Sequence, residues 1–380
     1  MARLGDICKI VSGSTPSTST ADYWDGKIKW ITPAELDEDS FYITDSIRHI
    51  TELGRTKTGL SYMPVGTVIL SSRAPIGKTA IAGCEMCCNQ GFKNLICSEK
   101  IYNEYLYFFL KSKTDFLNSL GRGATFKELS KSIVENIEIP LPTYEEQIKI
   151  AVCIRKLEEL ILLRKQQLSK LDELVKSRFV EMFGDTILNP FGWKKDLLGT
   201  VCDVRDGTHD SPQYYETGYP LVTSKNVTGG KIDLTDCSLI CETDYKKINE
   251  RSRVDTGDII MPMIGTVGKP VIVDIEPNFA IKNVALIKFK SESKVINIYI
   301  RALLQSDYFD DAVVSKVRGG TQKFISLGDI RKLEILVPPI ESQEQFAAFV
   351  EQIDKSKSEI QRSLEKLETL KKALMQKYFG

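Results

Sequence analysis

Histidine is scarce in this chain: only 2 of its 380 residues are histidines. His49 and His209 also fall at unrelated places in the sequence, so there is little material for acid–base catalysis by imidazole. No apolar run approaches the roughly 18 residues that a membrane helix requires, and residues 1–10 hold no apolar stretch of signal-peptide length. We therefore expect a cytoplasmic protein with no membrane partner.

The chain also lacks an excess of charge of either sign, since 51 basic residues balance 51 acidic ones. Proteins that bind nucleic acids often carry a basic excess. Any surface of this chain that binds a polyanion must therefore be a local patch.

The cysteines lack a regular spacing. Nine are present, an odd number, with a cluster at Cys84, Cys87, Cys88 and Cys97 that has no counterpart in the second half. A zinc knuckle is the alternative interpretation, but irregular spacing and scarce histidine disfavour it. We expect reduced thiols, no metal site and no cofactor.

What the sequence does contain is an internal repeat. Residues 4–8 (LGDIC) recur at 198–202 (LGTVC), and residues 65–78 (VGTVILSSRAPIGK) at 256–269 (TGDIIMPMIGTVGK). Residues 121–142 correspond to 318–339, and 168–184 to 364–380, the last pair with 7 of 17 positions identical. Because the offset drifts by only a few residues, the whole chain is a diverged duplication.

Each copy ends in a segment typical of a long helix. Residues 144–182 and 341–378 contain neither glycine nor proline, and prolines at 140, 142, 338 and 339 precede them. Apolar residues recur at 3,4 spacing along both segments, which predicts a coiled-coil contact between the two helices. The predicted contact residues are Leu157, Ile161, Leu168, Leu171 and Val175 in the first helix, and Ile353, Ile360, Leu364, Leu367 and Leu374 in the second. The alternative is that each helix only caps its own domain.

Enzyme motifs appear only as near misses. Residues 72–79 (SRAPIGKT) resemble a phosphate-binding loop, but Ser72 replaces the first glycine and Pro75 lies within the loop. Residues 189–191 (NPF) lack the second proline of an amino-methyltransferase loop and are better interpreted as a linker turn. We expect no catalytic residues.

The order of domain, proline stop and helix, repeated twice, resembles the specificity subunits of type I restriction-modification enzymes. The resemblance covers essentially the whole chain and is most specific at residues 137–150 (IEIPLPTYEEQIKI) and 333–347 (LEILVPPIESQEQFA). It implies an α+β fold with two tandem mixed α/β target-recognition domains, 1–142 and 185–339. A long helix follows each, at 143–184 and 340–380, and the two pair as an antiparallel coiled coil.

The resemblance further implies a non-catalytic, sequence-specific DNA-binding subunit of a type I restriction-modification complex. Each domain would read one half of a bipartite site in double-stranded DNA. Two methyltransferase subunits and restriction/translocase subunits would be its protein partners and would supply the catalysis.

Candidate DNA-binding residues follow from residue type and from the repeated glycine-bearing turns. Glycine permits close approach of the backbone, Arg and Lys neutralise phosphate or reach guanine, and Asn or Gln can read adenine. The candidates are Arg73, Lys78, Arg122, Thr125 and Lys127 in the first half, and Lys225, Asn226, Lys269, Arg318, Thr321, Gln322 and Lys323 in the second. The alternative for any one of them is an ordinary solvated loop.

Two other classes of function remain open. One is a methyltransferase or restriction enzyme that acts alone, which would transfer a methyl group without an added subunit. The other is a protein–protein scaffold, which zero net charge would suit but which would not need duplicated basic turns.

Overall fold

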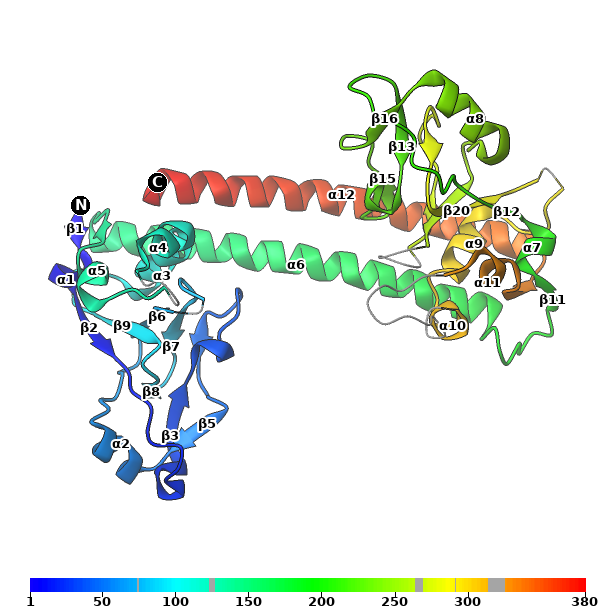
Figure 1. The fold of residues 1–380 in the computed structure, drawn as a ribbon. Coiled ribbons are helices and arrows are strands. Elements are labelled where there is room, and N and C mark those ends of the chain that lie inside the picture. The colour runs from blue at the N-terminus through cyan, green and yellow to red at the C-terminus, as the bar shows by residue number, and fades with distance from the viewer. Residues whose placement is uncertain (74, 123–126, 264–268, 291, 314–324) are drawn as a thin grey trace. The chain divides into compact units, whose positions relative to one another are not determined.

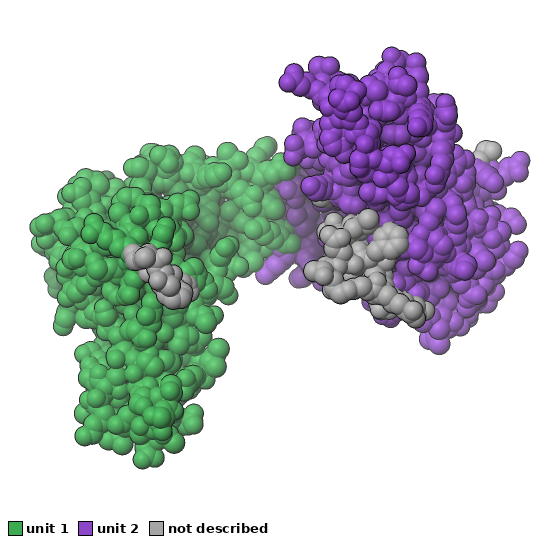
Figure 2. Space-filling model, viewed as in Figure 1, with its two compact units in different colours: residues 1–165, 362–380 green, residues 166–361 purple. Residues whose placement is uncertain are grey.

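The computed structural model describes the chain except residues 74, 123–126, 264–268, 291 and 314–324 (Figure 1). The chain divides into two compact units (Figure 2). Unit 1 combines residues 1–165 with residues 362–380, and unit 2 comprises residues 166–361. Each unit therefore contains one globular part and a portion of both long helices.

Unit 1 is built on three small sheets. Its strands are β1 (Ala2–Arg3), β2 (Cys8–Ser12), β3 (Trp24–Ile31), β4 (Tyr42–Ile43), β5 (Arg48–Ile50), β6 (Val68–Ser71), β7 (Thr79–Ala82), β8 (Cys87–Cys88), β9 (Phe92–Cys97) and β10 (Glu138–Ile139). The central sheet has the order β2-β9-β6-β7-β4, a second has the order β5-β3-β8, and β1 pairs with β10. Strands β6 and β7 are buried at every position, as is usual for strands covered on both faces.

Short helices cover these sheets. They are α1 (Leu4–Ile7), η1 (Ala21–Tyr23), η2 (Pro33–Glu35), α2 (Glu52–Thr58), α3 (Asn103–Ser112), α4 (Thr114–Leu120) and α5 (Lys131–Glu135). Helix α3 buries its aromatic run from Tyr105 to Phe109 in the main core of the unit. Phe379, from the last turn of the second long helix, lies in the same core.

Unit 2 repeats this plan. Its strands are β11 (Lys194–Leu197), β12 (Asp203–Asp206), β13 (Tyr219–Val222), β14 (Val227–Thr228), β15 (Lys231–Ile232), β16 (Ser238–Ile240), β17 (Ile259–Pro262), β18 (Val271–Ile272), β19 (Ala280–Ile281), β20 (Val284–Lys288) and β21 (Glu334–Val337). They form sheets of order β12-β20-β17-β18 and β16-β13-β19 and the pairs β11-β21 and β14-β15.

The helices of unit 2 correspond in order to those of unit 1, except that η1 has no counterpart among the described residues. They are α7 (Leu198–Val201), η3 (Ser224–Asn226), α8 (Glu242–Ser252), α9 (Asn297–Leu303), α10 (Asp307–Ala312) and α11 (Leu327–Arg331). Tyr299 of α9 takes the place that Tyr105 has in α3: the two hydroxyls donate to the carbonyls of Leu336 and Pro140, each at 2.9 Å. The duplication seen in the sequence is thus a duplication of the fold.

Three runs of the sequence with strand-like composition form strands, with bounds that agree to within one residue. Residues 67–70, 258–261 and 285–289 correspond to β6, β17 and β20. Their pairing partners also correspond: β6 pairs antiparallel with β9 in unit 1, and β17 pairs antiparallel with β20 in unit 2.

The two predicted long helices are also confirmed. They are α6 (Tyr144–Phe183) and α12 (Ile340–Phe379), each of 40 residues. At the start of α6, Thr143 accepts from the amide of Glu146 at 3.3 Å and the Glu146 carboxylate accepts from the amide of Thr143 at 3.0 Å, a reciprocal cap. Gly184 follows the helix with φ +78°, the left-handed geometry that glycine adopts without strain.

A buried glutamine closes each junction between a globular part and its helix. The Gln147 amide donates to the carbonyls of Lys100 and Pro142 and accepts from the amide of Tyr102, all within 3.0 Å. Gln343 makes the same three bonds in unit 2 within 3.0 Å. Because both side chains are fully buried and each makes three hydrogen bonds, they fix the first turn of each helix to the domain before it.

The long helices pack against each other in antiparallel fashion within each unit. In unit 1, Glu158 of α6 pairs with Lys371 of α12 at 2.5 Å, and Lys165, further along α6, pairs with the earlier residue Glu368 at 3.8 Å. In unit 2, the ammonium of Lys357 pairs with Asp172. The predicted contact residues are buried or half-buried on both helices: Leu157, Ile161, Leu168, Leu171, Val175, Ile353, Ile360, Leu364, Leu367 and Leu374. Among the helices that the structure describes, none is both long and apolar enough to cross a membrane.

Candidate nucleic-acid interface

Two polar turns lie side by side in unit 1. The first lies between β6 and β7 and includes Ser72, Arg73 and Lys78, and the second follows α4 and includes Arg122, Lys127 and Glu128; residues 74 and 123–126 are outside the described residues. The amide of Leu129 donates to the carbonyl of Ser72 at 2.9 Å, and Arg122 and Glu128 exchange backbone bonds of 3.1 and 3.0 Å. The backbone thus brings Arg73, Arg122 and Lys127 into one region of the surface.

An internal ion pair supports these turns. Lys93 of β9 is only 6% exposed, and its ammonium lies 3.1 Å from a carboxylate oxygen of Glu128 and 3.4 Å from the hydroxyl of Ser72. A buried ammonium needs such partners, because desolvation of a lone charge is costly. The Glu128 carboxylate therefore pairs with Lys93 and not with the neighbouring cations Arg122 and Lys127.

The cations of this region differ in their availability. Arg122 and Lys127 are exposed, and neither forms an ion pair with a described residue. Arg73 is half-buried and crosses the backbone of Gly91, where an added Cβ would lie 3.4 Å from its Nε. Lys78 instead donates to the carbonyls of Pro33 and Leu36, so its ammonium ties the first turn to η2.

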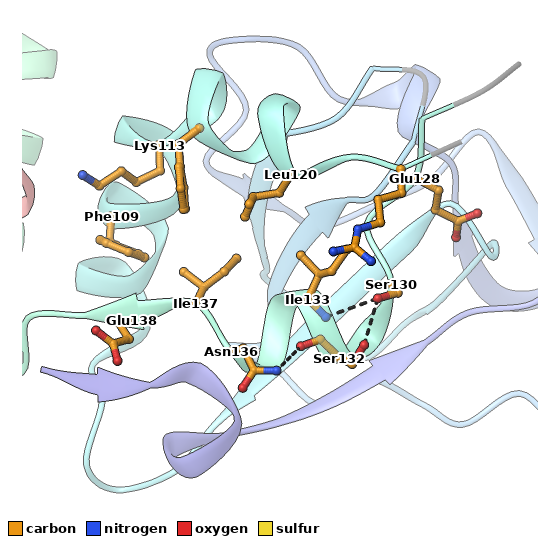
Figure 3. A pocket seen from close by; sticks show the side chains of 12 residues that line it. Phe109, Lys113, Leu120, Glu128, Ser130, Ser132, Ile133, Asn136, Ile137 and Glu138 are labelled. Atoms are coloured by element: carbon orange, nitrogen blue, oxygen red, sulfur yellow. Dashed lines mark hydrogen bonds between the residues drawn. The ribbon is translucent and has the colours of Figure 1, made fainter. Parts of the chain in front are cut away.

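An open groove adjoins the second turn (Figure 3). It encloses about 1150 Å³ between α3, α4 and α5 and the start of β10. Phe109, Leu120 and Ile137 give it apolar walls, and Arg122 and Glu128 lie at its polar side. Arg122 therefore lies at the edge of the groove, where a bound molecule could contact it.

In unit 2 the described candidates fall into two groups. Lys225 and Lys269 are exposed. Asn226 is only 7% exposed, and its side-chain oxygen accepts from the amide and hydroxyl of Thr223 at 3.0 and 2.9 Å, so it caps η3. The candidates Thr125, Arg318, Thr321, Gln322 and Lys323 lie outside the described residues.

The equivalent cap in unit 1 shows what sequence reasoning missed. Glu35 accepts from the amide and hydroxyl of Thr32 at 2.7 and 2.9 Å, as Asn226 does from Thr223. The signal was available: a threonine followed three residues later by a side-chain acceptor, repeated at an offset of 191 residues. It marks residues 32–35 and 223–226 as corresponding turns.

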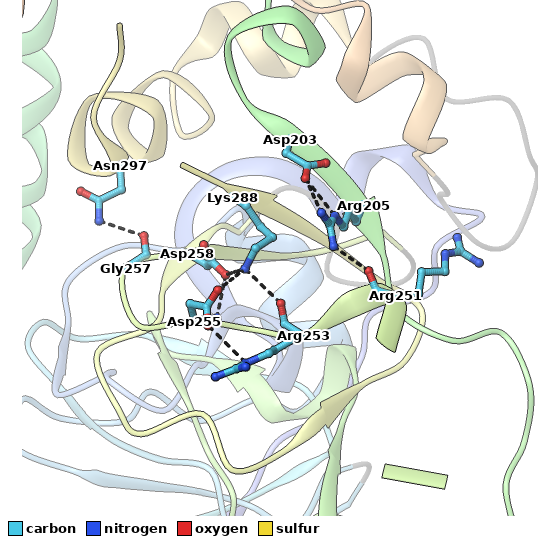
Figure 4. Close-up of polar contacts among 9 residues, drawn as sticks. All are labelled: Asp203, Arg205, Arg251, Arg253, Asp255, Gly257, Asp258, Lys288 and Asn297. Atoms are coloured by element: carbon cyan, nitrogen blue, oxygen red, sulfur yellow. Dashed lines mark hydrogen bonds and ion pairs between the residues drawn. The ribbon is translucent and has the colours of Figure 1, made fainter. Parts of the chain in front are cut away.

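Many other cations of unit 2 are held in ion pairs (Figure 4). Lys288 lies 2.7 Å from Asp255 and 2.6 Å from Asp258, and Arg205 lies 2.6 Å from Asp203. The bond from Lys288 holds the pKa of Asp255 below its usual range, whereas burial raises the pKa of Asp258. These charges are neutralised within the protein, which explains how a chain with many basic residues can offer only local patches.

A second polar cluster surrounds His209, in the loop after β12. Its Nε2 lies 2.8 Å from Asp206 and its Nδ1 lies 2.9 Å from the side-chain oxygen of Asn283. Both partners are acceptors, so both ring nitrogens must donate, and the bonds to Asn283 and Asp206 raise the pKa of His209. Asp206 also accepts from Arg251. The loop therefore favours a positively charged histidine that is exposed to solvent.

The remaining motifs of the sequence have structural roles. Residues 72–78 connect two antiparallel strands, whereas a phosphate-binding loop leads from a strand into a helix. All nine cysteines are free thiols. No group of three metal-ligating side chains is found among the residues that the structure describes.

Comparison with protein families gives a match over nearly the whole chain. Residues 1–173 and 190–372 match the family model of the type I restriction modification DNA specificity domain. The two matched ranges correspond to the two copies of the repeat.

Individual relatives agree. The chain is 32% identical to the type I restriction enzyme MjaIX specificity subunit of Methanocaldococcus jannaschii, covering 99% of this chain and 91% of the relative. It is 21% identical to the EcoKI specificity subunit of Escherichia coli, over 81% of this chain and 72% of that one.

Solved structures share the fold. The S subunit of a type I restriction-modification system from M. genitalium aligns with a TM-score of 0.57 at 15% identity, covering 100% of this chain and 95% of that one. A chain from a study of the assembly of a type I R-M system aligns with a TM-score of 0.61 at 20% identity, covering 100% and 96%. The duplicated fold, the family match and the full-length relatives agree: this chain belongs to the family of type I restriction-modification specificity subunits, which are the non-catalytic subunits of those systems.

Proposed function

We propose that this chain reads a bipartite site in double-stranded DNA, with the globular part of each unit reading one half. The observation that carries the proposal is the duplication: the family model matches twice, and the central strand pairings β6-β9 and β17-β20 recur in the two units. Two copies that have diverged in their loops are suited to two different half-sites, because loops carry recognition while the scaffold holds them.

The proposed DNA surface of unit 1 is formed by Arg73, Arg122 and Lys127. In unit 2 it includes Lys225 and Lys269 and, from the repeat, Arg318, Thr321, Gln322 and Lys323. These side chains would neutralise phosphates and fix register, because phosphate contacts position a protein while base contacts specify sequence. Lys78 and Asn226 support this surface indirectly. Lys78 donates to a backbone carbonyl, and Asn226 accepts from Thr223.

We further propose that the long helices recruit two methyltransferase subunits, with restriction/translocase subunits joining the complex. Leu160, Leu163 and Leu174 of α6 are 44%, 53% and 46% exposed. They are separated by 3 and 11 residues, close to whole turns of a helix, so they lie along one side of α6. An exposed apolar stripe of this kind supports a protein partner.

A test of recruitment replaces two of these leucines by charged residues. Leu163→Glu with Leu174→Glu should abolish co-purification with the methyltransferase subunits and leave the unfolding transition of the isolated chain unchanged. The matched control is Ser169→Glu with Lys170→Glu, at exposed positions of the same helix. Retention of the partners by the leucine variant would contradict the recruitment surface.

DNA binding is tested with Arg122→Ala and Lys127→Ala together. Loss of two phosphate contacts should weaken binding and reduce the slope of log affinity against log salt by about 1.8. The control is Lys27→Ala with Lys57→Ala, which removes two exposed cations elsewhere in unit 1. If both double variants have the same affinity and the same salt slope, the turn is not part of the interface. If the assembled complex binds no DNA, the proposal fails and the scaffold alternative is favoured.

Methyl transfer distinguishes the other alternative. With DNA and a labelled methyl donor, the isolated chain should transfer no label, and label should appear only after methyltransferase subunits are added. Transfer by the isolated chain would make it an enzyme and contradict the proposal.

A further inference from the structure

We propose that Gln90 and Lys282, which lie in corresponding loops of the two units, each contact one base pair in the major groove. Gln90 binds the adenine of an A·T pair and Lys282 the guanine of a G·C pair. This inference rests on the proposed DNA-reading function and names residues that the turns discussed above do not include.

Gln90 and Lys282 lie in loops that join corresponding strands. Gln90 lies two residues before Phe92 of β9, which pairs with Ser71. Lys282 lies two residues before Val284 of β20, which pairs with Pro262. The loop of unit 1 is one residue longer: Lys282 directly follows β19, whereas Asn89 lies between β8 and Gln90.

Both positions face a loop that packs tightly on the backbone beside them. In unit 1 the loop is residues 13–20, after β2, and the amide of Ser14 donates to the carbonyl of Cys88 at 3.1 Å. In unit 2 it is residues 207–212, after β12, and the amide of Thr208 donates to the carbonyl of Ile281 at 3.0 Å. We call them the hydroxyl loops, because serine and threonine occur in both.

A glycine permits this close approach in each unit. A Cβ on Gly13 would lie 2.2 Å from the carbonyl oxygen of Cys88, and one on Gly207 would lie 2.4 Å from that of Ile281. Distances below 3.0 Å to backbone exclude any side chain. The fold therefore holds the two hydroxyl loops in corresponding positions by the same means.

Each hydroxyl loop bonds the side chain at the proposed reading position. The hydroxyl of Thr15 bonds the side-chain oxygen of Gln90. The ammonium of Lys282 donates to the hydroxyl of Ser211 at 2.7 Å. These bonds orient the two side chains but leave groups available for a base: both protons and the second lone pair of the Gln90 amide, and two protons of the Lys282 ammonium.

The hydroxyl loops are themselves anchored. In unit 1, the indole nitrogens of Trp24 and Trp30 donate to the carbonyls of Ser17 and Ser14, each at 3.0 Å. In unit 2, His209 bonds Asp206 at the end of β12 and Asn283 beside Lys282. A side chain that distinguishes one base from another needs such support, because the discrimination depends on a fixed side-chain geometry.

Exposure and charge favour a base edge as the ligand. Gln90 and Ser211 are exposed, and Lys282 is half-exposed. Gln90 is uncharged, and the hydroxyl loop beside Lys282 carries the exposed carboxylate Asp210, which repels phosphate but can accept a hydrogen bond from cytosine N4. Arg73 at Gly91 adjoins Gln90 and can hold the phosphate backbone beside it.

The chemistry of the two side chains fixes the bases. A glutamine amide presents one donor and one acceptor, which match N7 and N6 of adenine. A lysine presents only donors, which match O6 and N7 of guanine. Side chains of different chemistry in corresponding loops would let the two units read different half-sites with one scaffold.

The test is a selection of randomised DNA duplexes bound by the full chain assembled with its methyltransferase subunits. In wild type, we expect one A·T pair in one half-site and one G·C pair in the other to depend on these residues. Gln90→Ala should lower discrimination at the A·T pair by between about 5-fold and about 150-fold and leave the other half-site unchanged. Lys282→Ala should do the same at the G·C pair, and Lys282→Gln should shift the preference there from guanine to adenine.

Matched controls are Lys231→Ala in unit 2 and Lys27→Ala in unit 1, both exposed and outside the hydroxyl loops. They should leave every selected base unchanged. Methylation of the wild-type site by each variant complex provides a second readout that a folding failure would abolish.

Three results would overturn the inference. Unchanged bases with uniformly weaker binding in the variants would make these residues phosphate contacts. Unchanged bases with unchanged affinity would place them outside the interface. If the wild-type complex selects no sequence at all, the proposed function fails together with the inference, whereas the first two results leave that function standing.

Discussion

The ring of Phe379 lies 5.1 Å from the ring of Tyr105, inside the core of unit 1. In unit 2, Phe183 lies 4.8 Å from Tyr299 in the same manner. The last turn of α12 therefore completes the core formed by the first part of the chain, and the last turn of α6 completes the core of unit 2. Residues 362–380 belong to unit 1 for this reason.

Removal of either ring should destabilise the chain strongly. Phe379→Ala should lower the free energy of unfolding by about 3 to 5 kcal/mol, because it leaves a cavity in a closely packed core. Phe183→Ala should have a similar effect on unit 2. Leu370→Ala, at a residue of α12 that is 48% exposed, is the control and should change stability by less than about 1 kcal/mol. A Phe379 variant as stable as the control would contradict the packing.

The Lys93–Glu128 pair should respond unequally to loss of its two partners. Glu128→Ala leaves a buried ammonium without its carboxylate and should cost about 1 to 3 kcal/mol, because the Glu128 side chain is 44% exposed and solvent screens part of the attraction. Lys93→Met removes the charge, fills similar space and should cost less. Urea unfolding of both variants measures the difference. If the methionine variant is the less stable, the ion pair is not the element that anchors residues 121–128.

Protonation of His209 should stabilise unit 2. The bonds to Asn283 and Asp206 raise its pKa above the ordinary value of 6.5. A raised folded pKa gives a contribution that is complete below the unfolded pKa and is lost as pH rises through the folded one. The difference in melting temperature between wild type and His209→Ala should thus be larger near pH 5.5 than near pH 8.5.

The same pKa can be measured directly by NMR, since the chain has only two histidines. His49→Gln leaves a single imidazole signal to titrate. Asn283→Ala, and separately Asp206→Asn, should lower its pKa. A His209 pKa at or below 6.5 in wild type would show that these contacts do not hold the proton.

A fragment of residues 1–184 should associate with itself. It lacks Phe379, so the space beside Tyr105 is open, and it carries the equivalent residue, Phe183, without its own core. Two fragments can exchange these rings about a twofold axis. Sedimentation should show a folded dimer at high concentration, and Phe183→Ala should prevent it. A fragment that is folded and stays monomeric at high concentration would contradict the exchange.

Much of the fold could be predicted from the sequence, because its strongest signals are periodic. The absence of glycine and proline over nearly 40 residues and the 3,4 spacing of apolar residues predicted α6 and α12. Recurring segments predicted two equivalent domains. What spacing does not report is which core a helix end enters, so the places of Phe183 and Phe379 appear only in three dimensions.

The candidate interface was harder to predict for a physical reason. The sequence does not distinguish a lysine that is available to bind phosphate from one that bonds a backbone carbonyl. Lys269 is exposed and Lys78 bonds a carbonyl, yet both were predicted as DNA contacts. Asn226 was chosen as a reader of adenine, and its side-chain oxygen caps η3. The hydroxyl loops could not be recognised because residues 13–20 and 207–212 have diverged in sequence while keeping their backbone contacts.

The most direct test of the central claim is a map of methylated bases in a genome exposed to this chain together with its methyltransferase subunits. The account predicts one motif made of two short blocks separated by a gap of fixed length whose bases are unspecified. Arg73→Ala with Arg122→Ala should then weaken methylation of that motif without changing the length of the gap. A continuous motif with no gap, or methylation by the chain without the other subunits, would contradict it.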